Sequence, residues 1–292
     1  MDGTFKIVGE PFTREGQLMT PTDTFAFCFT LSIIHVIACF GLFVLLPWVV
    51  DEYKIGLTKK ILHISAVIFL YSNVMMNFWK VLTTDTSSGS AVLPIFLQPG
   101  WKFCASCEAN SPPRAFHCHI CRHCVLKRDH HCPFTGNCIG NTNYRFYIQM
   151  IFYFWVASVY ANIMTFAFTW SILGEFSLYN LFRLVLPLLS CLLGQTDLYT
   201  FAVCVLSIMS IVGCMLLVAL LSFHLGNVVR GQTTFERSHR VHTYGLGLEQ
   251  NIKSVFGERW RYAWLFPSIN SPLPGDGITF LTKESLEKPK DL

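Results

Sequence analysis

The chain has 292 residues, of which 52% are hydrophobic and 14% are charged, and its formal net charge is +4. This composition is too apolar for an ordinary soluble domain and is typical of a protein with several membrane spans. The small positive charge gives no reason to expect a nucleic-acid partner.

Four apolar stretches are long enough to cross a bilayer, which takes about 20 helical residues. They are residues 25–50, 61–82, 148–173 and 201–225. Within them only Lys80 carries a formal charge, and it lies near a helix end, where its side chain can reach the membrane surface. The first stretch follows 24 mostly polar residues and is too long for the apolar part of a signal peptide, so we interpret it as a membrane helix.

A fifth apolar run, residues 178–194, contains Arg183 and Pro187. Membrane spans rarely tolerate such interruptions. We therefore expect an interfacial or re-entrant segment between the third and fourth spans.

Four spans place both termini on one side of the membrane, and 18 of the 22 basic residues would lie on that side. The positive-inside rule then makes that side the cytosol. The sequence predicts a cytosolic N-terminus, two membrane helices, a cytosolic loop, two further helices and a cytosolic C-terminal region, with the boundaries 1–24, 25–82, 83–147, 148–225 and 226–292.

Seven of the twelve cysteines fall within 35 residues of the long loop. They are Cys104, Cys107, Cys118, Cys121, Cys124, Cys132 and Cys138. Clustered thiols of odd number in a reducing compartment favour metal over disulfides, and Cys-x-x-Cys pairs are typical of zinc. Two closed zinc sites need eight ligands, which six cysteines and two histidines can supply. One cysteine then remains, but the count alone does not say which.

Cys132 directly follows the sequence Asp-His-His at 129–131. A neighbouring imidazole lowers the pKa of a thiol, and a carboxylate can hold that imidazole in one tautomer. These groups favour Cys132 as a free nucleophile. In the alternative interpretation Asp129 forms a turn and Cys132 replaces another cysteine as a ligand.

The cysteine-rich loop resembles that of the DHHC protein S-acyltransferases, the palmitoyltransferases. The resemblance is carried by residues 104–147, by QTTFE at 232–236 and by YGLGLEQNIKSVFG at 244–257, and it covers most of residues 25–257. The matching positions outside the loop are Thr233, Thr234, Glu236, Tyr244, Asn251, Phe256 and Gly257.

The resemblance implies two structural zinc ions and a catalytic set in which Cys132 is the nucleophile, His130 the general base and Asp129 its orienting partner. The ligands of the first zinc would be Cys104, Cys107, His117 and Cys124. Those of the second would be Cys118, Cys121, His131 and Cys138. His119 and His123 have no place in the pattern and are expected to face solvent.

The chain departs from the family pattern at two places. Phe134 stands where the family has Trp, which keeps an aromatic ring but removes a hydrogen-bond donor. TTDTSSG at 83–89 stands where the family has Asp-Pro-Gly. We expect the first departure to bear on the rate or the lipid preference, and the second on the role of that turn.

The predicted fold is an α-helical polytopic membrane protein with four transmembrane helices and a cytosolic two-zinc cysteine-rich domain between the second and third. The implied function is transfer of a fatty acyl chain, from palmitoyl-CoA or a related acyl-CoA, through Cys132 to cysteines of membrane-associated proteins at the bilayer. Four basic residues of the loop are candidates to meet the CoA phosphates, although they could equally be solvated or face lipid: Arg114, Arg122, Lys127 and Arg128.

Two alternatives remain: a RING-like zinc module that recruits a conjugating enzyme, and a catalytically silent family member that acts as a membrane adaptor. The ending KPKDL resembles a dilysine retrieval signal, so we expect the endoplasmic reticulum or Golgi.

Overall fold

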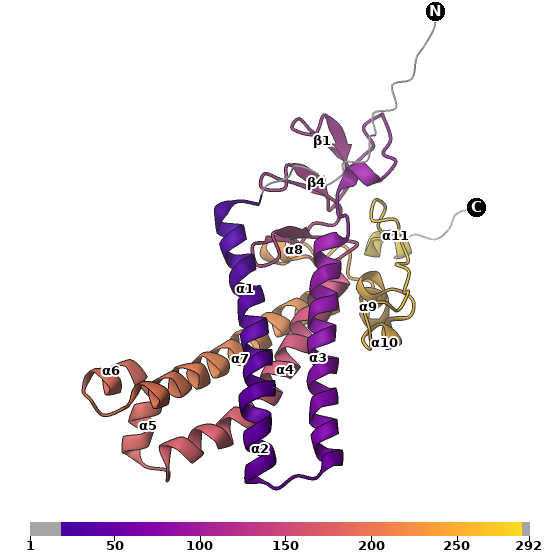
Figure 1. Ribbon diagram of the computed structural model, residues 1–292. Helices are drawn as coiled ribbons and strands as arrows, with labels where there is room; N and C mark the ends of the chain where they lie inside the picture. Colours follow the sequence, from indigo (N-terminus) through magenta and orange to yellow (C-terminus); the bar gives the residue numbers. More distant parts are fainter. Residues whose placement is uncertain (1–18, 288–292) are drawn as a thin grey trace, which may run out of the picture. The chain divides into compact units, whose positions relative to one another are not determined.

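The computed structural model describes residues 19–287, and most of these are helical. Four helices within this part of the chain are long and apolar enough to cross a membrane (Figure 1). They cover Pro21–Glu52, Leu57–Thr83, Tyr144–Leu173 and Leu198–Arg230. The four predicted spans are thus confirmed, and each helix extends beyond the apolar stretch that revealed it.

The first span is one continuous path made of three helical pieces. Helix α1 (Pro21–Phe40) passes into a single π-helical segment, η1 (Gly41–Leu45), and then into α2 (Leu46–Glu52). Pro47 explains the change, since it has no N–H and its ring collides with the carbonyl four residues earlier in a regular helix. A π segment is a usual way to absorb such a defect.

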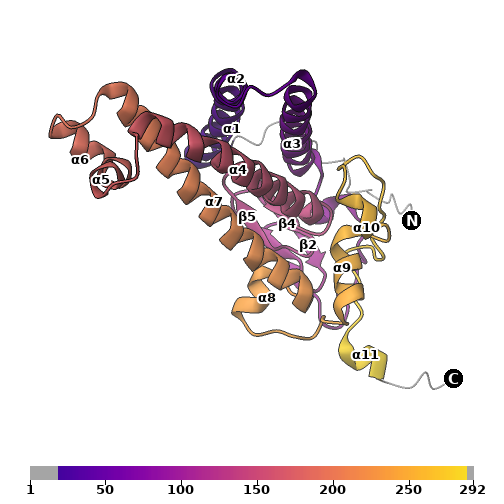
Figure 2. The ribbon, with the colours of Figure 1, turned by 90° about the horizontal axis from the view of Figure 1, so that it is seen from below.

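Helices α3 (Leu57–Thr83), α4 (Tyr144–Leu173) and α7 (Leu198–Arg230) are the other three spans. The fifth apolar run forms two short helices, α5 (Leu178–Val185) and α6 (Pro187–Leu192), which connect α4 to α7 (Figure 2). The break falls at Leu186, because the residue before a proline is disfavoured in helical conformation. The prediction that this run is not a span is confirmed.

Three antiparallel hairpins with three-residue strands make up the region between α3 and α4. They are β1 (Lys102–Cys104) with β2 (Ala109–Ser111), β3 (Phe116–Cys118) with β4 (His123–Val125), and β5 (His130–Cys132) with β6 (Asn137–Ile139). A 3-10 turn, η2 (Ser88–Ser90), precedes them. Isolated hairpins this short are only marginally stable, so side-chain links between them are needed.

Short helices follow α7: α8 (Thr234–Ser238), α9 (Leu248–Phe256), α10 (Trp260–Ala263) and α11 (Lys283–Glu287). The ending KPKDL and residues 1–18 lie outside the described residues. The retrieval signal and most of the predicted N-terminal segment are therefore not addressed by the structure.

The described chain divides into two compact units. One comprises residues 19–30, 76–149 and 224–287, which include all three hairpins and the C-terminal helices. The other comprises residues 31–75 and 150–223, the middle parts of the spans with α5 and α6. All residues of the candidate site belong to the first unit.

The second unit has an apolar core in which Ile34, Leu70, Val74 and Tyr153 pack together. Next to this core is a cavity of about 80 Å³ with mostly apolar walls from α1, α2, α3 and α4. His63 and Tyr160 line it and hydrogen-bond to each other.

Candidate functional site

The first cluster of metal-binding groups joins the first two hairpins. Cys104 and Cys107 come from the end of β1 and the turn that follows it, while His117 and Cys124 face each other across β3 and β4. The four candidate ligand atoms lie within 4.8 Å of one another. The sulfur of Cys107 is 3.2 Å from Nδ1 of His117.

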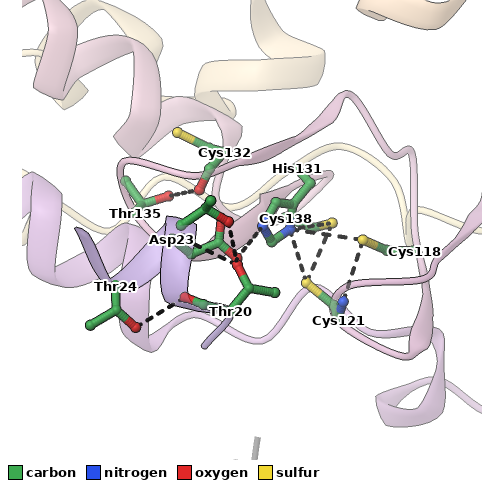
Figure 3. A network of polar contacts seen from close by, with 10 residues as sticks. Thr20, Asp23, Thr24, Cys118, Cys121, His131, Cys132, Thr135 and Cys138 are labelled. Carbon is green, nitrogen blue, oxygen red and sulfur yellow. Dashed lines mark hydrogen bonds and ion pairs between the residues drawn. The ribbon is translucent and has the colours of Figure 1, made fainter. Parts of the chain in front are cut away.

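The second cluster has the same construction one hairpin later. Cys118 and Cys121 come from the end of β3 and its turn, while His131 and Cys138 face each other across β5 and β6. Nδ1 of His131 lies 3.3 to 3.8 Å from the three sulfurs, all within the same 4.8 Å limit. Figure 3 shows the imidazole directed at the sulfurs.

Both clusters fit zinc. Three thiols and one imidazole are a usual donor set for structural zinc, and four protein ligands leave no position open. In each cluster Nδ1 of the histidine faces the sulfurs. Zinc bound there would therefore tie consecutive hairpins together.

An internal repeat underlies this arrangement, and it was missed in the sequence. The strands β1, β3 and β5 end at Cys104, Cys118 and Cys132, so the hairpins recur every 14 residues. The position three residues further on is Cys107 in the first hairpin and Cys121 in the second, but Thr135 in the third.

The repeat explains why Cys132 belongs to neither cluster. Each cluster takes a Cys-x-x-Cys pair from one hairpin and a His-Cys pair from the next. The third hairpin has the first cysteine of such a pair, Cys132, but not the second, and no further hairpin follows it in the described chain. The sulfur of Cys132 points away from the second cluster (Figure 3).

Asp129, His130 and Cys132 form a catalytic series at the third hairpin, in which a hydrogen bond joins the first two residues. Nδ1 of His130 lies 2.7 Å from Oδ2 of Asp129. Cys132, on the same strand, is 3% exposed, and the His130 imidazole is close enough to affect the pKa of its thiol. Because Nδ1 is engaged by the carboxylate, Nε2 is the ring nitrogen that remains for the thiol.

The electrostatics of this series favour an ion pair between sulfur and imidazole. Burial raises the pKa of the Cys132 thiol, but the neighbouring His130 imidazole and its charge, together with Thr135, outweigh burial, so the pKa is lowered. Burial lowers the pKa of His130, but the Asp129 carboxylate and the Cys132 thiol together outweigh burial and raise the pKa to about 9. Burial would raise the pKa of Asp129, but His130 holds it below its usual value. The arrangement can therefore present a nucleophilic thiolate at neutral pH.

The carboxylate of Asp129 is fixed from a second direction by the start of α8. The backbone N–H of Thr234 donates to Oδ1 at 2.7 Å, and the Thr234 hydroxyl donates to Oδ2 at 2.7 Å. The QTTFE segment thus contacts the catalytic series directly. Its contact point, Asp129, lies 105 residues earlier in the chain.

His224, near the end of α7, is a site residue that the sequence interpretation did not name. Its ring nitrogen lies 3.8 Å from Asp129 and hydrogen-bonds to the Tyr144 hydroxyl at 3.0 Å, and its ring contacts His130 and Tyr147. An ionisable residue in an apolar stretch indicates function by default, which is the signal that could have found it.

Asp129, His130 and His224 also lie close enough together to be tested as a metal site. The geometry argues against one. Oδ2 of Asp129 already accepts hydrogen bonds from His130 and from Thr234. The group is better described as a hydrogen-bonded network that orients His130.

Glu236 holds the same short helix in place. Thr233 and Glu236 form a capping box at the start of α8. The guanidinium of Arg114 donates to both oxygens of Glu236, at 2.6 and 2.7 Å, and both side chains are buried. Arg114 also lies over the ring of Tyr244. The cysteine-rich loop and the C-terminal region therefore share one buried ion pair.

Asn251 joins the C-terminal region to the end of α7. Its side chain donates to the carbonyl of Val229 and accepts from the N–H of Leu246. Gly231, with a φ of +67°, leaves it room, since a Cβ there would lie 2.7 Å from the Asn251 oxygen. One backbone group in the last turn of α7 and one in the segment after it are satisfied in this way.

Two of the four basic residues considered for binding the CoA phosphates make buried contacts within the protein instead. Arg114 pairs with Glu236, and the buried amine of Lys127 donates to the Ser254 carbonyl at 3.0 Å. Arg122 is exposed. The candidates Arg114 and Lys127 thus support the fold, and neither is a solvated side chain.

The expectation for the two spare histidines was right for one and wrong for the other. His119 is exposed, as predicted. Both ring nitrogens of His123 are buried and have no hydrogen-bond partner among the described residues. His123 lies opposite Cys118 in the second hairpin and is only partly exposed, so its ring does not simply face solvent.

The two departures from the family pattern occupy different environments. Phe134 follows the catalytic series in the third hairpin and is 52% exposed. Residues 83–89 still join the cysteine-rich region, because the Thr86 carbonyl accepts from Leu126 and the Asp85 carbonyl accepts from Thr142. This turn therefore keeps backbone contacts with the site region without the family's proline.

The chain is similar to known proteins over most of its length. A family model described as DHHC palmitoyltransferase matches residues 98–241. The chain is 36% identical over 225 residues to the probable palmitoyltransferase ZDHHC24 of Rattus norvegicus, covering 76% of this chain and 78% of that protein. It is 37% identical over 231 residues to the ZDHHC24 of Danio rerio, covering 78% of each. It is 32% identical over 203 residues to the palmitoyltransferase ZDHHC15 of Homo sapiens, covering 64% of this chain and 53% of that protein.

Proposed function

Because the chain belongs to the DHHC palmitoyltransferase family, we propose that it is a protein S-acyltransferase in which Cys132 carries the acyl chain between donor and acceptor. The resemblance noted in the sequence is confirmed by this membership. The observation that carries the proposal is that Cys132 lies outside both metal-binding clusters and beside His130, which hydrogen-bonds to Asp129.

The reaction consists of two thioester exchanges. Nε2 of His130 takes the proton of the Cys132 thiol, and the thiolate attacks the acyl carbon of a fatty acyl-CoA, palmitoyl-CoA or a relative. The bond to the CoA sulfur breaks, and CoA leaves with the proton that His130 returns. A cysteine thiol of a membrane-associated protein then gives its proton to His130 and attacks the acyl-enzyme, which restores Cys132.

Asp129 orients the base in both steps. Its Oδ2 accepts from Nδ1 of His130, which leaves Nε2 toward the sulfur and stabilises the imidazolium that forms. Thr234 and the network around His224 fix the carboxylate in turn. This chain of contacts supports Cys132 as the nucleophile.

The two clusters are proposed as the zinc ligand sets, one formed by Cys104, Cys107, His117 and Cys124 and the other by Cys118, Cys121, His131 and Cys138. Zinc would be structural, since each closed set holds its hairpins together and offers no open position. The proposal keeps Cys132 free for chemistry.

The four apolar helices fit a multi-pass membrane protein. We place the hairpins and both termini in the cytosol, because most basic residues lie on that side of the predicted topology. The endoplasmic reticulum or Golgi is the proposed location. The family membership gives no support to a RING-like module, and the intact catalytic series speaks against a silent adaptor.

Self-acylation tests the proposal. Purified protein in detergent is incubated with labelled palmitoyl-CoA, and the label is challenged with neutral hydroxylamine, which cleaves thioesters. Wild type is compared with Cys132→Ser and with Cys39→Ser, which removes a thiol outside the cluster region, and zinc is measured in all three. We expect hydroxylamine-sensitive label on wild type and Cys39→Ser only, with two zinc ions in each.

Two results would contradict the proposal. An unlabelled wild type that holds two zinc ions would favour the silent adaptor. Loss of zinc from Cys132→Ser would show that Cys132 is a ligand and that the spare thiol is another cysteine.

A further inference from the structure

The start of the first membrane helix contacts the third hairpin through two side chains. Asp23, in the first turn of α1, lies with Oδ2 3.4 Å from Nε2 of His131, and both side chains are buried. Met19, just before the helix, lies against Gly136 in the turn after Cys132, where an added Cβ would approach the Met19 side chain to 2.2 Å.

Asp23 is held in this position by the helix end. The Thr20 hydroxyl donates to Oδ2 of Asp23 at 2.7 Å, and the N–H of Asp23 donates back to that hydroxyl at 3.2 Å. Figure 3 shows the result: His131 lies between the carboxylate on one side and three cysteine sulfurs on the other. Its Nδ1 faces the sulfurs, so the proton belongs on Nε2, which donates to Asp23.

We propose that Asp23 is a positioning residue for the second zinc cluster, whose carboxylate orients the ligand His131 and so couples the first membrane helix to the strand that carries Cys132. The inference rests on the zinc assignment of the proposed function. A carboxylate on the outer nitrogen of a ligating histidine fixes the ring and makes it a stronger donor to the metal.

The first cluster provides a comparison within the same molecule. Its histidine, His117, makes no ion pair with a carboxylate in the described part of the chain and instead contacts the ring of His119. The two clusters have the same ligand types but differ in this one support. Removing the carboxylate of Asp23 should therefore affect one zinc and not the other.

The test measures zinc release and does not depend on activity. Wild type, Asp23→Ala and Asp23→Asn are mixed with excess chelator in detergent, and zinc loss is followed with time. Alkylation of freed thiols, read by mass spectrometry, assigns each loss to a cluster. Asp197→Asn is the matched control, because Asp197 also caps a membrane helix, α7, through Thr200 and contacts no candidate ligand.

We expect one zinc to leave Asp23→Ala about 10 to 100 times faster than wild type, with Cys118, Cys121 and Cys138 alkylated first. Asp23→Asn keeps the size and a hydrogen-bond acceptor, so the same cluster should be affected less, and this variant decides the question if Asp23→Ala does not fold. Asp197→Asn should behave as wild type.

Equal release from both clusters in the Asp23 variants, or release no faster than in Asp197→Asn, would overturn the proposal. A wild type with fewer than two zinc ions would overturn the ligand assignment and this inference together. Self-acylation of the same wild-type sample separates the outcomes, since the acyltransferase function can stand while the role of Asp23 fails.

Discussion

Cys132 differs from the cysteines around it through a single neighbour. Cys104 and Cys118 each have a second cysteine three positions later, whereas Cys132 has Thr135. The remaining polar contacts of Cys132 are with His130 and Thr135. The first two hairpins each offer a Cys-x-x-Cys pair to a candidate zinc cluster, whereas the third offers only His131 and Cys138 and leaves Cys132 beside His130.

Thr234 offers a test of how Asp129 is oriented. Thr234→Val removes the hydroxyl that donates to Oδ2 but keeps the backbone donor to Oδ1. A hydrogen bond to a charged group contributes about 1.5 to 3 kcal/mol, so the self-acylation rate should fall by roughly tenfold or more. The measurement is the rate of labelling at saturating palmitoyl-CoA.

The matched control is Thr279→Val, which removes a similar hydroxyl bond to Asp276 in an exposed turn. It should label at the wild-type rate. Equal rates for both variants would show that the carboxylate needs no help from Thr234.

Lys127 should make the stability of the folded protein depend on pH, and its pKa fixes the direction. Burial, reinforced by the positive charge of Arg114, lowers the pKa of Lys127 from 10.5 to about 7. Between these values the unfolded chain binds more protons than the folded one, so stability rises with pH. Relative to Lys127→Met, the free energy of unfolding of the wild type should increase by about 1 kcal/mol per pH unit from pH 7 to 9.

Thermal unfolding of both proteins in detergent at several pH values checks this. Lys283→Met, at an exposed position, is the control and should follow the wild type. If the melting temperatures of wild type and Lys127→Met changed with pH in the same way, the Lys127 amine would have to stay protonated in the folded protein.

At the scale of elements, the short helix α8 matters because of what it joins. Its first residue holds Asp129, and its capping glutamate pairs with Arg114 before the second hairpin. A helix of five residues has little stability of its own. Its position therefore depends on these two contacts.

Glu236→Ala should destabilise the protein strongly. It leaves the buried guanidinium of Arg114 without its partner, and breaking such a pair costs about 3–5 kcal/mol. It also removes the capping box of α8. We expect a clear drop in the melting temperature together with slower self-acylation.

Glu249→Ala is the comparison, since Glu249 forms an exposed ion pair with Lys253. Exposed pairs contribute little, so its melting temperature should match wild type. A Glu236→Ala protein as stable as Glu249→Ala would show that water reaches and solvates Arg114.

At the scale of the whole molecule, the four spans could be predicted because a membrane helix must be apolar along its whole length, and that property is local. The break before α6 could be predicted for the same reason, from Arg183 and Pro187. The π segment η1 could not, since a proline in a span indicates a defect without specifying how the backbone absorbs it.

The sequence by itself determined the family, the span pattern and the number of ligands, because these depend on composition, spacing and count. Only the tertiary structure decided that Thr234 and His224 meet at Asp129 and that Asp23 reaches His131. Each of these contacts joins residues from distant parts of the chain. Which polar groups share a buried site depends on how the elements pack, and no local pattern records it.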